Sequence, residues 1–247
     1  MQAISPLDVY KRAAPMKVGG RYVVKSADFT RENVEVVGVP GFTLSDVALT
    51  GGTCGIRLNK CEGFRLVNLF VQGMRNPVGG SDGHGIQAIN CGGLIHYCWV
   101  DALGGDIPAA TPGDSEDLIN IYGDEPATLQ KHVIIELCHT YNRSRSDTCT
   151  HICIDGPFPP KVTVLQNRGM NSRCYITCAG GLGHDIQMNS SYGADTDIYV
   201  VDYYPTGHEK VYGIMDRITV VKNVFPKGVL LDQASRFGKL CKFQGAS

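Results

Sequence analysis

The stretch Gly55-Ile56-Arg57-Leu58-Asn59-Lys60-Cys61-Glu62-Gly63-Phe64-Arg65-Leu66 returns 30 residues later as Gly85-Ile86-Gln87-Ala88-Ile89-Asn90-Cys91-Gly92-Gly93-Leu94-Ile95-His96. Each copy contains a short alternating segment, a turn rich in Asn, Cys or Gly, and a second apolar segment. Alternation with a period of two places Ile56 and Leu58 inside a strand layer and Arg57 outside it. Repetition at this spacing predicts a solenoid.

Weaker copies of the unit continue toward the C-terminus. They are Leu118–Ile121 with Val133–Ile135, His151–Ile154 with Val162–Val164, Tyr175–Thr177 with Ile186–Met188, and then Ile198–Val200 and Ile218–Val220. One unit cannot bury its apolar face alone, whereas stacked units pair every strand above and below and share a continuous core. The sequence therefore predicts an all-β protein, a single-stranded parallel β-helix over residues 31–222.

The open ends of such a solenoid must be covered, because they expose unpaired backbone. Ser5 followed by Pro6 is typical of a helix start, with Ser5 as the N-cap and Pro6 at the first helical position. We expect residues 1–30 to form an N-terminal helical cap. We expect residues 223–247, which contain several apolar side chains, to form a C-terminal cap.

Composition excludes several classes of partner. The chain has 247 residues, with Lys+Arg 23 against Asp+Glu 24 and no basic stripe, so nucleic acid is not expected as a partner. Its apolar stretches are too short for membrane insertion, and the N-terminus carries no signal peptide, which predicts synthesis in the cytoplasm. The ten cysteines are expected to be reduced, and Cys61, Cys91 and Cys178 to stack on equivalents in neighbouring coils.

Three segments carry a resemblance to a known family. Gly113–Asn120, Val133–Glu136 and Tyr175–Gly181 resemble the right-handed parallel β-helix proteins of the pectate-lyase-like superfamily, over roughly residues 41–222. The resemblance implies a right-handed coil, and the superfamily includes polysaccharide lyases, glycoside hydrolases and bacteriophage tailspikes. The complete catalytic sets of the polygalacturonate-cleaving members are not present, and only Gly83-His84-Gly85 matches one element. The resemblance therefore implies a fold without a mechanism.

The best candidate for a catalytic site joins adjacent coils. If Ile86, Ile119 and Ile152 are equivalent, His84 and Asp117 lie on neighbouring strands about 4.8 Å apart. The candidate catalytic residues are Asp82, His84, Glu116, Asp117 and His151. Carboxylates and imidazoles are the groups that acid/base cleavage of a polysaccharide needs. The alternatives are acidic turn residues that bond their own backbone, or a Ca²⁺ site.

Two further clusters contain residue types that could form a site. Cys149, His151 and Cys153 alternate on one strand and could share a face, but their spacing matches no usual zinc pattern, so no metal is predicted. His184-Asp185 is interpreted as an exposed pair at a turn.

Tyrosines are concentrated late in the chain and could stack on sugar rings. The candidate glycan-binding residues are Tyr199, Tyr203 and Tyr204, with Tyr192 and Tyr212 nearby in the sequence. Alternation around Tyr199 places its ring outside the coil. The alternative is that these rings stack between coils or within a cap.

Two functions from different classes follow. The first is a structural or adhesion protein, a bacteriophage virion component that contacts a surface glycan, with particle proteins or a homo-oligomer such as a trimer as partners. The second is a polysaccharide lyase or glycoside hydrolase that uses the acidic and His cluster. The first is favoured, because no basic residue that could neutralise a uronate is evident beside the acidic cluster.

Overall fold

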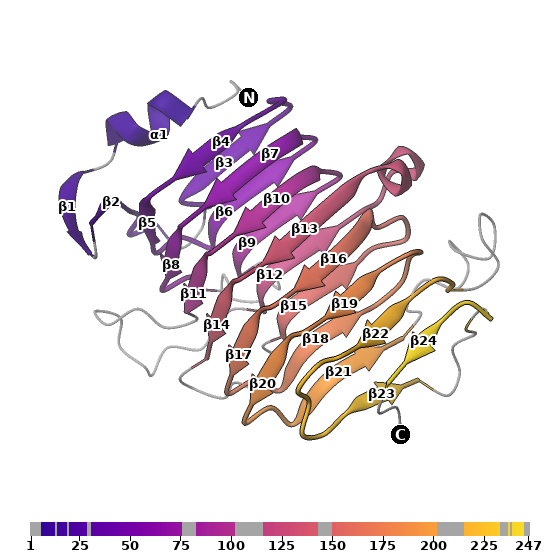
Figure 1. Ribbon diagram of the computed structural model, residues 1–247. Helices are drawn as coiled ribbons and strands as arrows, with labels where there is room; N and C mark the ends of the chain where they lie inside the picture. The colour runs from indigo at the N-terminus through magenta and orange to yellow at the C-terminus, as the bar shows by residue number, and fades with distance from the viewer. Residues whose placement is uncertain are drawn as a thin grey trace.

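The computed structural model in Figure 1 is an all-β architecture with one short α-helix. It describes residues 6–12, 14–18, 20–28, 31–75, 83–101, 116–142, 150–201, 215–232, 237 and 239–244. In this part of the chain the strands form three eight-stranded sheets, and every pairing is parallel except that of the first two strands. We call the three sheets A, B and C. Between the third and the twenty-second strand, successive strands pass from sheet B to sheet C to sheet A, an arrangement compatible with the predicted parallel β-helix.

The strands of each sheet follow one another along the stack (Figure 1). Sheet A holds β1 (Ala14–Val18), β2 (Arg21–Lys25), β5 (Val47–Thr50), β8 (Phe70–Gln72), β11 (Trp99–Asp101), β14 (His139–Tyr141), β17 (Arg168–Met170) and β20 (Ser190–Tyr192). Sheet B holds β3 (Val34–Val37), β6 (Cys54–Asn59), β9 (His84–Ile89), β12 (Asp117–Tyr122), β15 (Thr150–Asp155), β18 (Cys174–Cys178), β21 (Thr196–Val200) and β23 (Val229–Leu231). Sheet C holds β4 (Thr43–Ser45), β7 (Glu62–Val67), β10 (Gly92–His96), β13 (His132–Glu136), β16 (Lys161–Leu165), β19 (Asp185–Gln187), β22 (Thr219–Val221) and β24 (Lys242–Phe243).

The 30-residue repeat sets the register of the first strand of each copy. Ile56 pairs with Ile86, and Leu58 pairs with Ala88, and all four side chains are buried in the core as expected. In the second strand the register slips by one residue at Gly93, where a Cβ atom would lie 2.4 Å from the Phe64 carbonyl oxygen. Glycine therefore permits a close approach that no side chain would allow.

Sheet A is the part of the coil that sequence reasoning missed, because it expected two strands per unit and the structure has three. From β8 onward these strands are three residues long, and the middle residue of each is buried. A strand this short contains less than two periods of alternation, so it leaves no recognisable pattern.

The turns from sheet C to sheet A repeat one backbone conformation. Tyr97, Leu137, Gln166 and Met188 all have φ between 54° and 55°, a left-handed conformation that is costly for residues other than glycine. The residue that follows each of them points into the coil and stacks on the residue at the same position of the neighbouring coil. These stacked residues form a ladder along the interior. Its best example is Asn189, whose side-chain oxygen accepts bonds of 2.9 and 3.0 Å from the backbone and side-chain N–H groups of the preceding rung. The ladder offsets the backbone cost by satisfying buried polar groups.

The cysteines of the two copies of the 30-residue repeat also stack. The backbone N–H of Cys61 donates to Sγ of Cys91 at 3.2 Å, one coil further along. The nine cysteines in the described part of the chain are free thiols.

The ends of the stack differ from each other. Helix α1 (Pro6–Arg12) begins at Pro6 as predicted, and Val9 packs into the core while the Tyr10 hydroxyl donates to the Ser45 carbonyl at 2.7 Å. Ser5 lies outside the described residues. At the other end, the range expected to be a C-terminal cap contributes β23 and β24 as the last strands of sheets B and C.

Candidate functional site

Strands β9 and β12 bring His84 and Asp117 together on the outer side of sheet B. The two residues are paired in register, as predicted from the repeat, and His84 Nδ1 lies 3.8 Å from an Asp117 carboxylate oxygen. Glu116 lies directly before Asp117, and its N–H donates to the Gly83 carbonyl at 2.7 Å. These residues line a pocket of about 320 Å³, which we call the sheet B pocket. Its described lining is Arg57, His84, Gln87, Ile89, Glu116, Asp117, Asn120, Tyr122 and Asp155.

Asp117 is the residue of this pocket whose chemistry is most altered by its surroundings. Only 6% of it is exposed, and burial raises the pKa of its carboxyl to about 8, with Glu116 as the next cause. The Asn120 amide donates a 2.9 Å hydrogen bond that acts in the opposite direction. Near neutral pH this carboxyl therefore holds its proton, as a general acid must.

A chain of polar side chains crosses the sheet toward Asp117. Arg57 Nε donates to Gln87 Oε1 at 2.6 Å, and Gln87 Nε2 donates to Asn120 Oδ1 at 3.3 Å. Arg57 also forms an ion pair with Glu32. The expectation that no basic residue lies beside the acidic cluster is therefore wrong, since Arg57 lines the same pocket. The signal was present in the sequence, because Arg57, Gln87 and Asn120 are equivalent positions of successive coils.

His151 does not join this cluster. Thr150 is the residue paired with Asp117, and His151 turns into the interior together with Ile152. Its Nδ1 lies 2.9 Å from the Thr140 hydroxyl, and its ring meets the Tyr175 ring edge-on at 6.0 Å. Complete burial lowers the pKa of His151 to about 3, so its ring is neutral. Asp82 lies outside the described residues.

The Cys and His strand does not form a shared ligand face. His151 points inward, whereas Cys153 pairs with Asn120 and hydrogen-bonds the Asp117 carboxyl on the outer side of sheet B. Cys149 lies outside the described residues. The described part of the chain holds no group of three or more His, Cys, Asp or Glu side chains that could bind a metal.

His184 is buried, so its interpretation as half of an exposed pair is wrong. Its Nδ1 accepts a hydrogen bond from the Val162 N–H at 3.1 Å, and its Nε2 lies 2.8 Å from the Gly180 carbonyl. The ring therefore holds its proton on Nε2 and is neutral, a structural role between two coils.

Of the three tyrosines predicted to bind glycan, Tyr199 is described. It pairs with Thr177 and Leu230 on sheet B, and its hydroxyl donates to Asp232 at 3.5 Å. Tyr203 and Tyr204 lie outside the described residues.

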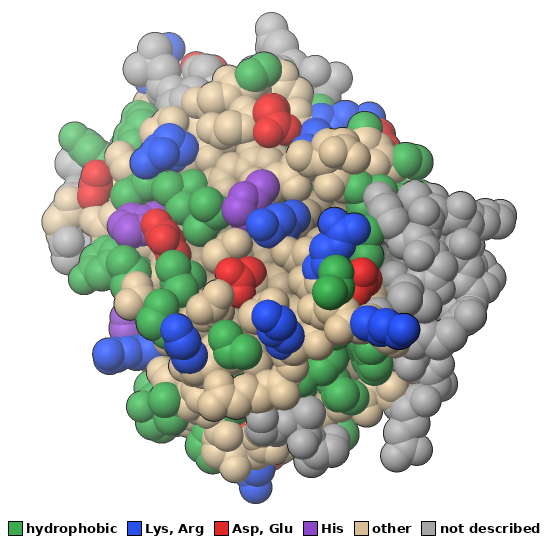
Figure 2. All heavy atoms as spheres, turned by 45° about the vertical axis from the view of Figure 1, so that its right-hand side comes forward, with side chains coloured by type: hydrophobic (Ala, Val, Ile, Leu, Met, Phe, Trp, Pro, Cys, Tyr) green, Lys and Arg blue, Asp and Glu red, His purple; other side chains and the backbone are tan. Residues whose placement is uncertain are grey.

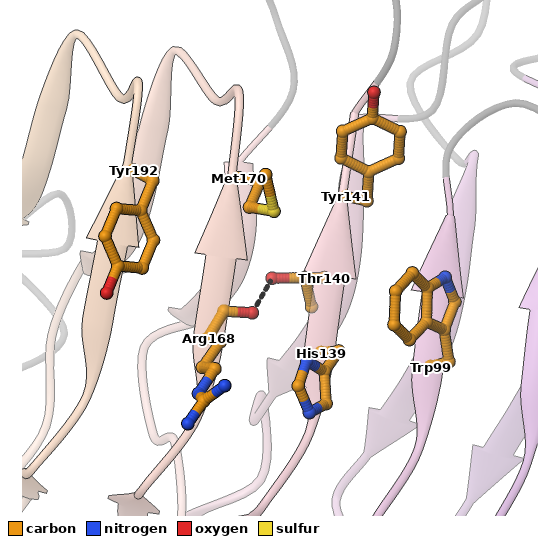
Figure 3. A pocket seen from close by; sticks show the side chains of 7 residues that line it. All are labelled: Trp99, His139, Thr140, Tyr141, Arg168, Met170 and Tyr192. Carbon is orange, nitrogen blue, oxygen red and sulfur yellow. Dashed lines mark hydrogen bonds between the residues drawn. The ribbon is translucent and has the colours of Figure 1, made fainter.

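A second pocket, of about 570 Å³, lies on the outer face of sheet A (Figure 3). We call it the sheet A groove. Its described lining is Trp99, His139, Thr140, Tyr141, Arg168, Met170 and Tyr192, from strands β11, β14, β17 and β20. The register places Trp99, His139 and Arg168 in one row along the stack, and Tyr141, Met170 and Tyr192 in a second row, as Figure 3 shows.

The groove presents aromatic rings to solvent. Trp99 stacks on His139 with ring centroids 5.3 Å apart and an interplanar angle of 11°. Trp99 remains 40% exposed and Tyr192 54% exposed. Burial, and next the charge of Arg168, lower the pKa of His139. Sequence reasoning missed this groove because its lining residues are far apart in the chain and belong to the unrecognised third strand of each coil. Of these residues, the sequence pattern indicated only Tyr192.

The face seen in Figure 2 carries mixed charge. Figure 2 shows acidic, basic and His side chains interspersed on one face. None of the helices in the described part of the chain has the length and apolar character needed to span a bilayer.

Comparison with known proteins adds no assignment: no protein-family model, curated protein or solved structure matches this chain. The proposals below rest on the geometry just described.

Proposed function

We propose that this chain is a right-handed parallel β-helix protein of the pectate-lyase-like kind that binds a glycan through the sheet A groove. One observation carries the proposal: Trp99, His139 and Tyr192 present their rings along one open groove from strands that are paired in register. A role in adhesion follows from such binding. Membership of a bacteriophage particle and assembly into a homo-oligomer stay predictions from the resemblance.

The groove matches the chemistry of a sugar chain. A sugar ring has an apolar C–H face that stacks on an aromatic ring, and hydroxyl edges that exchange hydrogen bonds with polar side chains. Trp99 and Tyr192 supply exposed ring faces, while His139, Tyr141 and Arg168 supply polar groups between them. Three coil steps separate Trp99 from Tyr192, roughly 14 Å at the usual strand spacing, which suits an extended ligand.

The scaffold favours binding because it holds the rings in advance. Trp99 and His139 stand on strands paired with a neighbour on each side, and Tyr192 stands on β20, the last strand of sheet A, which pairs with β17. Little backbone ordering is therefore needed when the ligand docks. No Asp or Glu lines the described part of the groove, so acid/base cleavage is not expected there. Binding without turnover is the function that this groove supports best.

The test is a glycan array followed by titration calorimetry. Trp99→Ala and Tyr192→Ala are each expected to weaken binding at least tenfold, because stacking contacts are lost. Tyr22→Ala is the matched control, an exposed tyrosine on β2 of the same sheet. Affinity unchanged in both groove variants would refute the proposal.

A second candidate function is glycan cleavage at the sheet B pocket, and the raised pKa of Asp117 favours it. We propose that Asp117 would donate its proton to the leaving glycosidic oxygen, while a carboxylate such as Asp155 takes a proton from the attacking water. Reducing ends released by the wild-type protein and not by Asp117→Asn would support this activity. Release of reducing ends that persists in the folded Asp117→Asn protein would show that Asp117 is not the general acid.

A further inference from the structure

The charge of the sheet A groove is carried by one residue. Arg168 is the only charged side chain at neutral pH among the described residues that line it. Asp101, at the end of β11, is buried and does not line the groove. Within the described part of the chain, no ion pair joins Arg168 to a carboxylate. An exposed guanidinium is therefore available to a ligand.

Arg168 lies in the same row of the groove as the stacked rings of Trp99 and His139. Arg168 follows His139 in register on the next strand, and Trp99 stacks on the opposite side of His139. A glycan chain with a sugar over Trp99 would thus carry a substituent past Arg168 two coils further along (Figure 3). A guanidinium at such a place presents a planar fork of donors that fits a carboxylate or a sulfate.

We propose that the ligand of the sheet A groove is an acidic glycan, whose carboxylate or sulfate group is bound by Arg168 while its sugar rings stack on Trp99 and Tyr192. This inference rests on the proposed function, because it names the class of glycan bound at the same site. It is carried by charge complementarity within the groove and not by the net charge of the chain, which is −1.

A second consequence involves His139, which faces Trp99 on β11, Arg168 on β17 and Tyr141 on its own strand. Burial, and next the charge of Arg168, lower the pKa of His139 in the free protein. An anion bound at Arg168 offsets that charge and raises the pKa of His139. By linkage, protons then promote binding, so affinity for an acidic glycan increases as pH falls through the titration of His139.

The experiment compares neutral and acidic ligands that share the same backbone. Dextran is compared with carboxymethyl-dextran and dextran sulfate, and cellohexaose with its carboxylated form. Binding to the full-length protein is measured by calorimetry at pH 8 and pH 6. We expect the acidic member of a pair to bind at least tenfold more tightly, and more tightly at pH 6 than at pH 8. Arg168→Gln should remove this preference and leave binding of the neutral member unchanged. The control is Arg65→Gln, which removes an exposed arginine from sheet C.

The outcomes separate the two proposals. Binding of both members weakened at least tenfold in Trp99→Ala, together with loss of only the acidic preference in Arg168→Gln, supports both. Equal affinity for neutral and acidic members, or a preference that survives Arg168→Gln, overturns the acidic-glycan inference and leaves the groove as a neutral-glycan site. Wild-type protein that binds none of these ligands overturns the inference. Affinity unchanged in both Trp99→Ala and Tyr192→Ala overturns the proposed function as well.

Discussion

The outer faces of sheets A and B are built on the same coils and differ in how their side chains are satisfied. On sheet B, Arg57, Gln87, Asn120 and Asp117 form a continuous chain of hydrogen bonds between coils. On sheet A, the row of Trp99, His139 and Arg168 stacks without such a chain, and much of its surface faces solvent. A row of equivalent positions thus leaves side chains open to a ligand where they do not hydrogen-bond one another, and we propose the face of sheet A as such a surface.

The largest expected effect concerns stability at the sheet B pocket. The Asp117 carboxyl has a pKa of about 8 in the folded chain against 3.8 in the unfolded one. Between these pH values only the unfolded chain loses the proton, so stability falls as pH rises from about 4 to 8, by roughly 4 kcal/mol at pH 7. Asp117→Asn should remove this dependence and be the more stable protein at pH 8, measured by urea unfolding at several pH values.

The control for this prediction is Asp185→Asn, a half-buried carboxyl on sheet C that accepts a bond from Gln187. It should keep the wild-type slope of stability against pH. An Asp117→Asn protein with that same slope would show that the carboxyl is ionised in the folded state. Burial of side chains on the face of sheet B would then not make stability depend on pH.

The next effect concerns the interior between the two faces. Because the pKa of His151 is about 3 when folded and 6.5 when unfolded, protons bind the unfolded chain first as pH falls. Stability is therefore lost below pH 6.5, by about 2 kcal/mol at pH 5. His151→Leu should lose correspondingly less between pH 7 and pH 5 in urea unfolding. His132→Gln, on the exposed side of sheet C, is the comparison: burial and then the charge of Lys161 also lower the pKa of His132, but less than that of His151, so this variant should change the pH dependence less than His151→Leu does.

A smaller effect is expected on ligand binding when the rings of sheet A and sheet B are compared. Trp99→Ala should weaken glycan binding at least tenfold, about 1.4 kcal/mol. Tyr199→Ala, which removes an aromatic ring from the outer face of sheet B, should change it less than twofold. Calorimetry with the best glycan from the array decides the point. The reverse order of effects would move the binding site to sheet B.

The smallest effect tests whether the polar chain on sheet B is structural. Gln87→Ala removes the group that accepts from Arg57 and donates to Asn120, and should cost about 1 kcal/mol of stability. Glycan affinity should not change. Thermal unfolding and calorimetry on the same samples check both parts, and weaker glycan binding in this variant would mean that the two faces are not independent.

Part of the candidate site could be predicted because the repeat aligns it. Equivalence of Ile86 with Ile119 was enough to place His84 beside Asp117. The same equivalence, carried from Ile119 to Ile152, places Thr150 and not His151 beside Asp117. The chain bends at the start of β15, so His151 and Ile152 both turn inward, as Leu118 and Ile119 do one coil earlier. A rule of strict alternation cannot anticipate that bend.

The sequence by itself determined the all-β class, the stacking of the units, the buried face of Ile56 and Leu58, and the neighbouring positions of His84 and Asp117. These depend on alternation and repetition, which are local and periodic. Only the tertiary structure decided the register slip at Gly93, the short strands of sheet A and the groove that they carry. Three-residue strands hold too little pattern to be recognised, and their side chains become neighbours only when coils bring distant residues within one strand spacing.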